Sequence, residues 1–173
     1  MKKVLILIII IAGVGFIYWH KNPQTSTNPT STTGSTTKPN PESATISFDD
    51  ESVTLSNGKD TNSDGEETEI LPQQDYGDLN NDGKDDTVFL VARSGGGSGV
   101  FIYAAAYVSG PINYKGSNAV FLGDRIAPKS IGVSNGVATI TYLDRREDEP
   151  FAAEPTISRT IKLVYENGEL VEK

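Results

Sequence analysis

The chain has 173 residues, no cysteine and one histidine, His20. The lack of cysteine excludes disulfides, thiolate chemistry and a lipidated anchor, and a single histidine beside the apolar N-terminus argues against an enzyme with an imidazole base. The net charge of −8 is concentrated, because residues 49–86 carry thirteen Asp and Glu against two lysines. Such a segment repels nucleic acid and attracts cations, so we expect no nucleic-acid partner.

The N-terminal residues 1–20 predict a membrane anchor. Two lysines precede an uncharged, mostly aliphatic run over residues 4–19, which as a helix reaches most of the way across a bilayer. The positive-inside rule then places the rest of the chain outside the cytoplasm, as a single-pass protein of the cell membrane. The alternative is a cleaved signal peptide with Gly13 and Gly15 before the cut, but no A-x-A triplet is present.

Residues 21–44 predict a flexible linker. They contain no large apolar residue and are dominated by Thr, Ser, Pro and Asn. This composition cannot offset the entropy cost of ordering the chain. We therefore expect a disordered tether between the anchor and an extracytoplasmic domain over residues 45–173.

Residues 45–173 predict a mainly β domain. Polar and apolar residues alternate, as in residues 157–165, and Asn-Gly dipeptides at 57–58, 135–136 and 167–168 are typical of hairpin turns. The clearest hairpin surrounds the second of these dipeptides. At this length we expect a small antiparallel sandwich or curled sheet of about seven or eight strands, preceded by one N-terminal transmembrane helix.

Two segments have the pattern of central strands. Residues 87–93 and 99–108 are apolar on both faces, which indicates that both faces of the sheet are covered there. The glycine-rich residues 94–98 between them are typical of a hairpin loop with unusual backbone angles. A phosphate-binding loop is the alternative, but the segment lacks a Lys-Ser/Thr ending and a following helix.

The strongest functional pattern is D-x-N-x-D-G-x-x-D at residues 78–86. Ca²⁺ prefers several hard oxygens from a tightly curled loop, in which alternate side chains converge on one centre and a glycine allows the sharp turn. The pattern predicts a structural calcium site formed by Asp78, Asn80, Asp82, the carbonyl of Lys84, and Asp86. The alternative is a series of Asx turns, in which the same side chains bind their own backbone.

A weaker copy of this pattern lies at residues 60–68. It predicts a second calcium site formed by Asp60, Asn62, Asp64, the carbonyl of Glu66, and Thr68. The threonine at the ninth position is a neutral and weaker ligand than a carboxylate. A further alternative is that the two loops share one ion.

The twelfth position of the first loop separates the families that use such loops. It is Phe89, inside a strand-like run, where an EF-hand requires a glutamate on a helix. The loop therefore resembles the short calcium loops of FG-GAP and VCBS-type repeats, which lead directly into a strand. The order GDLNNDG, SGGGSGVF and LGDR further resembles a domain of bacterial exported proteins with a single FG-GAP/VCBS-like calcium loop. This resemblance covers roughly residues 50–173 and implies topology and location, not an activity.

These patterns together predict a membrane-tethered, extracytoplasmic calcium-binding domain that is not an enzyme. We expect it to act as an adhesion or binding module for an envelope protein or glycan. One alternative is an envelope glycan hydrolase that uses paired carboxylates such as Asp124 and Glu154. The other is an ion-free component of a surface assembly, which would be favoured if the loop oxygens pointed away from a common centre.

Overall fold

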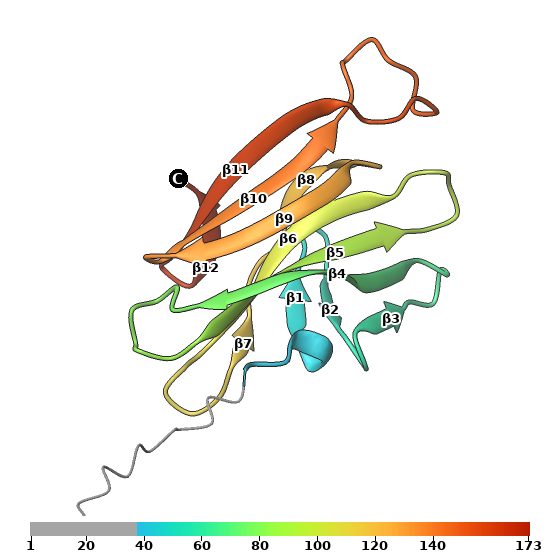
Figure 1. Ribbon diagram of the computed structural model, residues 1–173. Helices are drawn as coiled ribbons and strands as arrows, with labels where there is room; N and C mark the ends of the chain where they lie inside the picture. Colours follow the sequence, from blue (N-terminus) through green and yellow to red (C-terminus); the bar gives the residue numbers. More distant parts are fainter. Residues whose placement is uncertain (1–37) are drawn as a thin grey trace, which may run out of the picture. The chain divides into compact units, whose positions relative to one another are not determined.

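The computed structural model describes residues 38–173, which are built almost entirely from antiparallel strands (Figure 1). The helical structure in this part of the chain is one 3₁₀ turn, η1 (Pro41–Ser43). The prediction of a mainly β, antiparallel fold is therefore confirmed. The predicted anchor over residues 1–20 lies outside the described residues, and no helix within residues 38–173 is long and apolar enough to cross a membrane.

Twelve strands in the described residues form three sheets, with the orders β1-β2, β3-β4-β5-β6-β7 with β8 also paired to β6, and β12-β11-β10-β9. The predicted count of seven or eight strands is too low. Seven strands have five residues or more, whereas the other five have two to four and are too short to show an alternating pattern. The strands are β1 (Thr45–Ser47), β2 (Ser52–Thr54), β3 (Lys59–Thr61), β4 (Glu67–Gly77), β5 (Asp86–Ser94), β6 (Phe101–Val108), β7 (Lys115–Gly116), β8 (Val120–Asp124), β9 (Ala127–Ser134), β10 (Val137–Asp144), β11 (Ile157–Glu166) and β12 (Glu169–Glu172).

The central sheet is covered on both faces, as the two doubly apolar segments predict. On one side, Val88 and Leu90 of β5 pack against the sheet of β9 to β12, whose buried residues there are Ala138, Ile140, Leu163 and Leu170. On the other side, Phe89 and Val91 pack against the β1–β2 hairpin, through Ile46, Phe48 and Val53. Figure 1 shows these layers as a sandwich with a small third sheet. Burying each large apolar side chain stabilises the fold by about 1.5–3 kcal/mol.

The three Asn-Gly dipeptides form the turns that the sequence predicts. Asn57, Asn135 and Asn167 all have positive φ, at 54°, 52° and 53°, and each following glycine does too. This left-handed backbone is favoured by asparagine and glycine and matches the twist of a tight hairpin. Residues 94–98 connect β5 to its antiparallel neighbour β6, so the predicted hairpin is confirmed. The unusual backbone angles expected there are not seen, because none of Gly95, Gly96 and Gly97 is among the glycines with positive φ.

Folded structure begins before residue 45. The carbonyl of Pro39 accepts a hydrogen bond from the Thr87 hydroxyl at 2.7 Å, and Ala44 is 0% exposed. The side-chain oxygen of Asn40 caps the η1 turn by accepting from the N–H of Glu42 at 3.1 Å. Residues 39–44 thus belong to the folded unit, although their composition is that of the preceding linker. Proline and alanine occur both in flexible linkers and in segments packed on a sheet, so composition alone does not locate the boundary between linker and folded domain.

Candidate functional site

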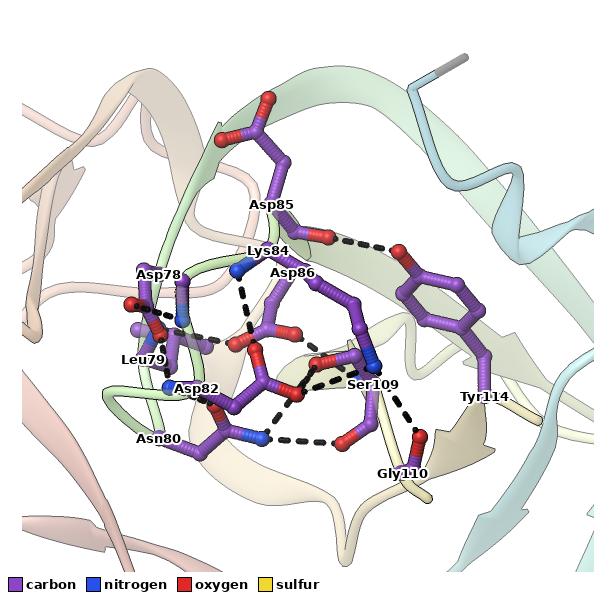
Figure 2. Close-up of polar contacts among 11 residues, drawn as sticks. Asp78, Leu79, Asn80, Asp82, Lys84, Asp85, Asp86, Ser109, Gly110 and Tyr114 are labelled. Carbon is purple, nitrogen blue, oxygen red and sulfur yellow. Dashed lines mark hydrogen bonds and ion pairs between the residues drawn. The ribbon is translucent and has the colours of Figure 1, made fainter. Parts of the chain in front are cut away.

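The acidic loop of residues 78–86 connects β4 to β5 (Figure 2). Its turn uses Asn81 and Gly83, whose φ angles of 61° and 82° lie in the left-handed region. Leu79 is only 2% exposed and anchors the loop in the core between the two larger sheets. The loop is therefore fastened at the start of the most buried strand of the domain.

Asp78 and Asn80 hold the shape of the loop by binding its own backbone. The carboxylate of Asp78 accepts hydrogen bonds from the N–H groups of Asp82 at 3.1 Å and Gly83 at 2.8 Å. The side-chain oxygen of Asn80 accepts from the N–H of Asp82 at 3.0 Å. These are the Asx-type bonds that form the alternative to calcium ligation. A carboxylate oxygen that accepts one N–H keeps a second lone pair, so the same oxygens can still bind a cation.

Ser109, which is not part of the motif, contacts three of the predicted ligands. Its N–H donates to Asp86 at 2.7 Å and its hydroxyl donates to Asp82 at 2.7 Å. Its carbonyl accepts from the side-chain amide of Asn80 at 2.9 Å. Ser109 directly follows β6, and the antiparallel pairing of β5 with β6 brings the end of one strand to the start of the other. Ser109 could therefore have been predicted only from the pairing of β5 with β6, and not from the spacing of residues within the loop.

Asp86 is the most buried group of the loop, at 0% exposure. One carboxylate oxygen accepts from the N–H of Leu79 at 2.8 Å and the other from the N–H of Ser109. Burial raises the pKa of Asp86 above its ordinary value, although both hydrogen bonds oppose the rise, and the charge of nearby Asp82 adds to it. A buried carboxylate beside another carboxylate is costly unless a positive charge compensates it.

The side chain of Asp82 is turned toward β6 and Lys84 (Figure 2). The ammonium of Lys84 lies 3.5 Å from the Asp82 carboxylate and 3.4 Å from the carbonyl of Gly110. The hydrogen bond from the Ser109 hydroxyl, aided by Lys84, lowers the pKa of Asp82. Within residues 38–173 no three acidic, histidine or cysteine side chains gather as a ready-made metal cluster. The predicted ligands Asn80, Asp82 and Asp86 are thus linked through Ser109, but their oxygens do not form a ready-made metal site, and Lys84 is the counter-charge of Asp82.

Residues 60–68 form the hairpin between β3 and β4. Asn62 shapes it, because its side-chain oxygen accepts from the N–H groups of Asp64 and Glu66, both at 3.0 Å. The carbonyl of Glu66, a predicted ligand, accepts from the N–H of Asn62 at 3.0 Å. Asp60 lies opposite Thr68 across the hairpin, and Thr68 is only 3% exposed. Calcium binding at this loop stays a prediction.

The two acidic loops lie at opposite ends of β4 (Figure 1). The ends of β4 pair with the ends of the 9-residue strand β5, which corresponds to a separation of roughly 25 Å. A single ion is held by oxygens at 2.3–2.6 Å. The alternative in which both loops share one calcium ion is therefore excluded by the topology.

Arg93 organises a second charged cluster, which the motif does not reveal. Its side chain is 7% exposed and forms ion pairs with Asp50 at 2.9 Å, with Glu66 at 2.6 Å and with Glu51. Its guanidinium also lies over the ring of Phe48, 4.8 Å from the centroid. Burial by itself lowers the pKa of Arg93, but the hydrogen bonds and charges of Asp50 and Glu66 outweigh burial and raise it. Part of the acidic excess is therefore used to hold the β1–β2 hairpin and the β3–β4 hairpin on the central sheet.

Asp124, one of the two carboxylates of the hydrolase alternative, is held in an ion pair. Its carboxylate lies 2.8 Å from the guanidinium of Arg125 and accepts from the N–H of Val100 at 2.9 Å. The hydrogen bond from Arg125 lowers the pKa of Asp124. A general acid in glycoside hydrolysis needs a raised pKa, so the surroundings of Asp124 do not suit that role.

Comparison of the chain with protein-family models, with curated proteins and with solved structures found no match in any of the three. The resemblance to FG-GAP/VCBS-like loops and to a domain of bacterial exported proteins therefore stays a prediction from the motifs.

Proposed function

We propose that this protein is a calcium-stabilised β domain, held outside the cytoplasm by an anchor at residues 4–19, that serves as a binding module of the cell envelope. The observation that carries the calcium part is Asp86, a fully buried carboxylate with a raised pKa at the end of an acidic loop. Residues 78–86 contain four aspartates and one lysine, a net charge of −3. A divalent cation would offset most of this charge.

The donor set of the loop suits calcium rather than a softer metal. Carboxylates and an amide oxygen are hard ligands, and neither cysteine nor histidine is present in residues 38–173. To bind the ion, Asp82 exchanges its contacts with Ser109 and Lys84 for the metal. The free-energy cost of breaking the Lys84–Asp82 ion pair is small, because the side chain of Lys84 is 54% exposed and an exposed ion pair contributes little to stability.

The location rests on the sequence of the N-terminus. Two lysines before the apolar run of residues 4–19 favour an anchor with the domain outside, and residues 21–37 supply a polar spacer before the fold begins. The binding role follows from the same arrangement, since a small tethered domain in the envelope meets proteins and glycans there.

Thermal melting of the full chain in a nonionic detergent tests the calcium proposal. Calcium at a hundred times its dissociation constant should stabilise the protein by about 2.7 kcal/mol, which raises the Tm by roughly 10 °C relative to a chelator. Magnesium should have a much smaller effect, because it requires a stricter geometry. Asp78→Asn should remove most of the shift, whereas the neighbouring Asp85→Asn should keep it.

A second candidate is an ion-free binding or assembly domain. It is favoured by the hydrogen bonds that the loop oxygens already accept, and by the lack of any group of three acidic side chains gathered at one point within residues 38–173. A Tm that is identical in calcium, magnesium and chelator would establish this candidate and overturn the calcium proposal. Calorimetric titration gives the stoichiometry, with one ion expected for residues 78–86 and two if residues 60–68 also bind.

A further inference from the structure

Two large aromatic side chains, outside the acidic loop, are exposed on the central sheet. Phe101 of β6 is 40% exposed and Phe121 of β8 is 55% exposed. Their ring centroids are 6.3 Å apart, and the ring of Tyr103 lies 5.3 Å from that of Phe121. We call these three residues the aromatic surface. Contiguous exposed apolar side chains mark interaction sites more often than single ones do.

Sheet geometry explains why these rings share one face. Phe101 and Tyr103 are two positions apart on β6, so their side chains point to the same side. Tyr103 lies opposite Phe121 in the β6–β8 register. Within residues 38–173, β8 pairs with no strand other than β6, although the end of β1 bonds Asn118 and Ala119 just before it. The aromatic surface therefore reaches the rim of the sheet.

Carboxylates border the aromatic surface on the side of the β1–β2 turn. Asp49, Asp50 and Glu51 form this turn and are all exposed. Phe48, just before them, contacts Tyr103 edge to face at 5.1 Å. Burial raises the pKa of Tyr103; the charge of Arg93 opposes the rise, and the charges of Asp50, Glu66 and Asp49 add to it, which places these carboxylates near the ring.

Two arginines of this protein are each held by an aromatic ring together with a carboxylate. Arg93 lies over Phe48 and pairs with Asp50, and Arg125 lies 4.3 Å from the ring centroid of Phe151 and pairs with Asp124. Across residues 38–173, no Lys or Arg side chain lies over the rings of the aromatic surface. Asp49 forms no ion pair within residues 38–173, and Asp50, Glu51 and Glu66 share the single positive charge of Arg93. A net negative charge therefore remains beside the rings.

We propose that the aromatic surface binds an arginine-bearing segment of a partner protein. The guanidinium stacks on Phe121 or Phe101, and the opposite charge comes from Asp49 and from the negative charge that Arg93 leaves uncompensated at Asp50 and Glu51. Arginine suits this site better than lysine, because its planar group is weakly hydrated and stacks on aromatic rings. The proposal deepens the binding role proposed above but does not depend on calcium. Phe101 pairs with Arg93 at the far end of β5, whereas the acidic loop joins β5 at Asp86.

The test uses the ¹⁵N-labelled full chain in a nonionic detergent and an unlabelled peptide of alternating arginine and glycine. Amide shifts should change at Phe101, Tyr103 and Phe121, and binding should weaken as salt is added. Phe121→Ser should weaken binding about two- to fivefold, as expected for one exposed cation–π contact. The matched control is Phe151→Ser, which removes a similarly exposed ring that is not part of the aromatic surface and should leave the affinity unchanged. Melting curves verify that both variants are folded.

A peptide of glutamate and glycine should not bind, and one of lysine and glycine should bind more weakly. Equal loss of binding in both phenylalanine variants, or shifts confined to other residues, would overturn the proposal. Shifts that depend on protein concentration without peptide would instead assign the surface to a second copy of the chain. Running the titration in calcium and in chelator separates this proposal from the calcium proposal, since either can fail while the other holds.

Discussion

At the scale of single residues, Asp86 joins three parts of the chain that are distant in sequence. It begins β5, and its carboxylate holds the backbone N–H groups of Leu79 in the acidic loop and Ser109 after β6. Both bonds are buried, so no water replaces the acceptor if the carboxylate is removed. Asp86 therefore fastens the loop whether or not calcium is bound.

Asp86→Ala should destabilise the protein by about 2–4 kcal/mol, because two buried N–H groups lose their acceptor. Asp85→Ala is the matched control, since the carboxylate of Asp85 points away from the other loop residues in Figure 2. It should change stability by no more than about 0.5 kcal/mol. Urea unfolding in the presence of a chelator measures both. Equal effects of the two variants would contradict the role assigned to Asp86.

Asp124 provides a prediction about pH. Its pKa is lowered in the folded state by Arg125, so the folded state holds fewer protons on this group than the unfolded state does. Its contribution to stability is therefore complete above the unfolded pKa of about 3.9 and is lost as the pH falls through the lower folded pKa. The stability difference between the wild type and Asp124→Asn should shrink as the pH falls from about 5 to about 2.

Urea unfolding across this pH range measures the effect of Asp124→Asn. Other groups that titrate there, including Asp86 with its opposite shift, cancel in the difference between the two proteins. Glu154→Gln, at an exposed carboxylate, serves as the control. A wild-type advantage over Asp124→Asn that stays constant down to pH 2 would show that the ion pair with Arg125 does not form.

Much of the candidate site could be predicted at this scale, and some could not. The spacing of residues 78–86 predicts a tight polar loop turned by Gly83, and the structure has that loop. Spacing could not reveal Ser109, because its contacts with Asp82 and Asn80 span 27 and 29 positions. Arg93 and its carboxylates were missed for the same reason.

At the scale of elements, turns were the most predictable features and short strands the least. An Asn-Gly dipeptide encodes its backbone angles locally, so all three turns could be recognised from two residues each. A strand of two residues such as β7 forms only because it pairs with β6, which lies beside it in the folded protein. No local pattern encodes that pairing.

Gly136→Ala should destabilise the protein by about 1–2 kcal/mol, because φ of 73° is strained for any residue with a Cβ. A steric clash does not contribute, since the nearest atom to an added Cβ is the carbonyl oxygen of Leu79 at 3.8 Å. Gly132→Ala on the adjoining strand β9 is the control, with no atom within 4 Å of the added group. Thermal melting compares the two. A smaller loss at Gly136 than at Gly132 would contradict this account of the turn.

At the scale of the whole molecule, the central sheet needs cover on both faces. The sheet of β9 to β12 covers one face, and the β1–β2 hairpin with the preceding residues 39–44 covers part of the other. Ala44 and Ile46 are both 0% exposed in this second layer. The N-terminal end of the folded unit is therefore part of the core and not an extension of the linker.

A chain that begins at residue 45 should be less stable than one that begins at residue 38, by about 2–4 kcal/mol. The shorter chain loses the burial of Pro41 and Ala44 and the hydrogen bond from Thr87 to Pro39. Urea unfolding of the two chains gives the difference. Equal stability would place the domain boundary at residue 45, as composition alone suggests.

The amino-acid sequence by itself determined the class of fold, the hairpin turns, the two central strands and the acidic loop, because each depends on alternation or on the backbone preferences of adjacent residues. Only the tertiary structure decided that Ser109 and Asp86 hold that loop, that Arg93 gathers three carboxylates, and that Phe101 and Phe121 form one surface. These contacts depend on strand order and register. Strand order is set by the packing of both faces of the central sheet, which no short stretch of sequence specifies.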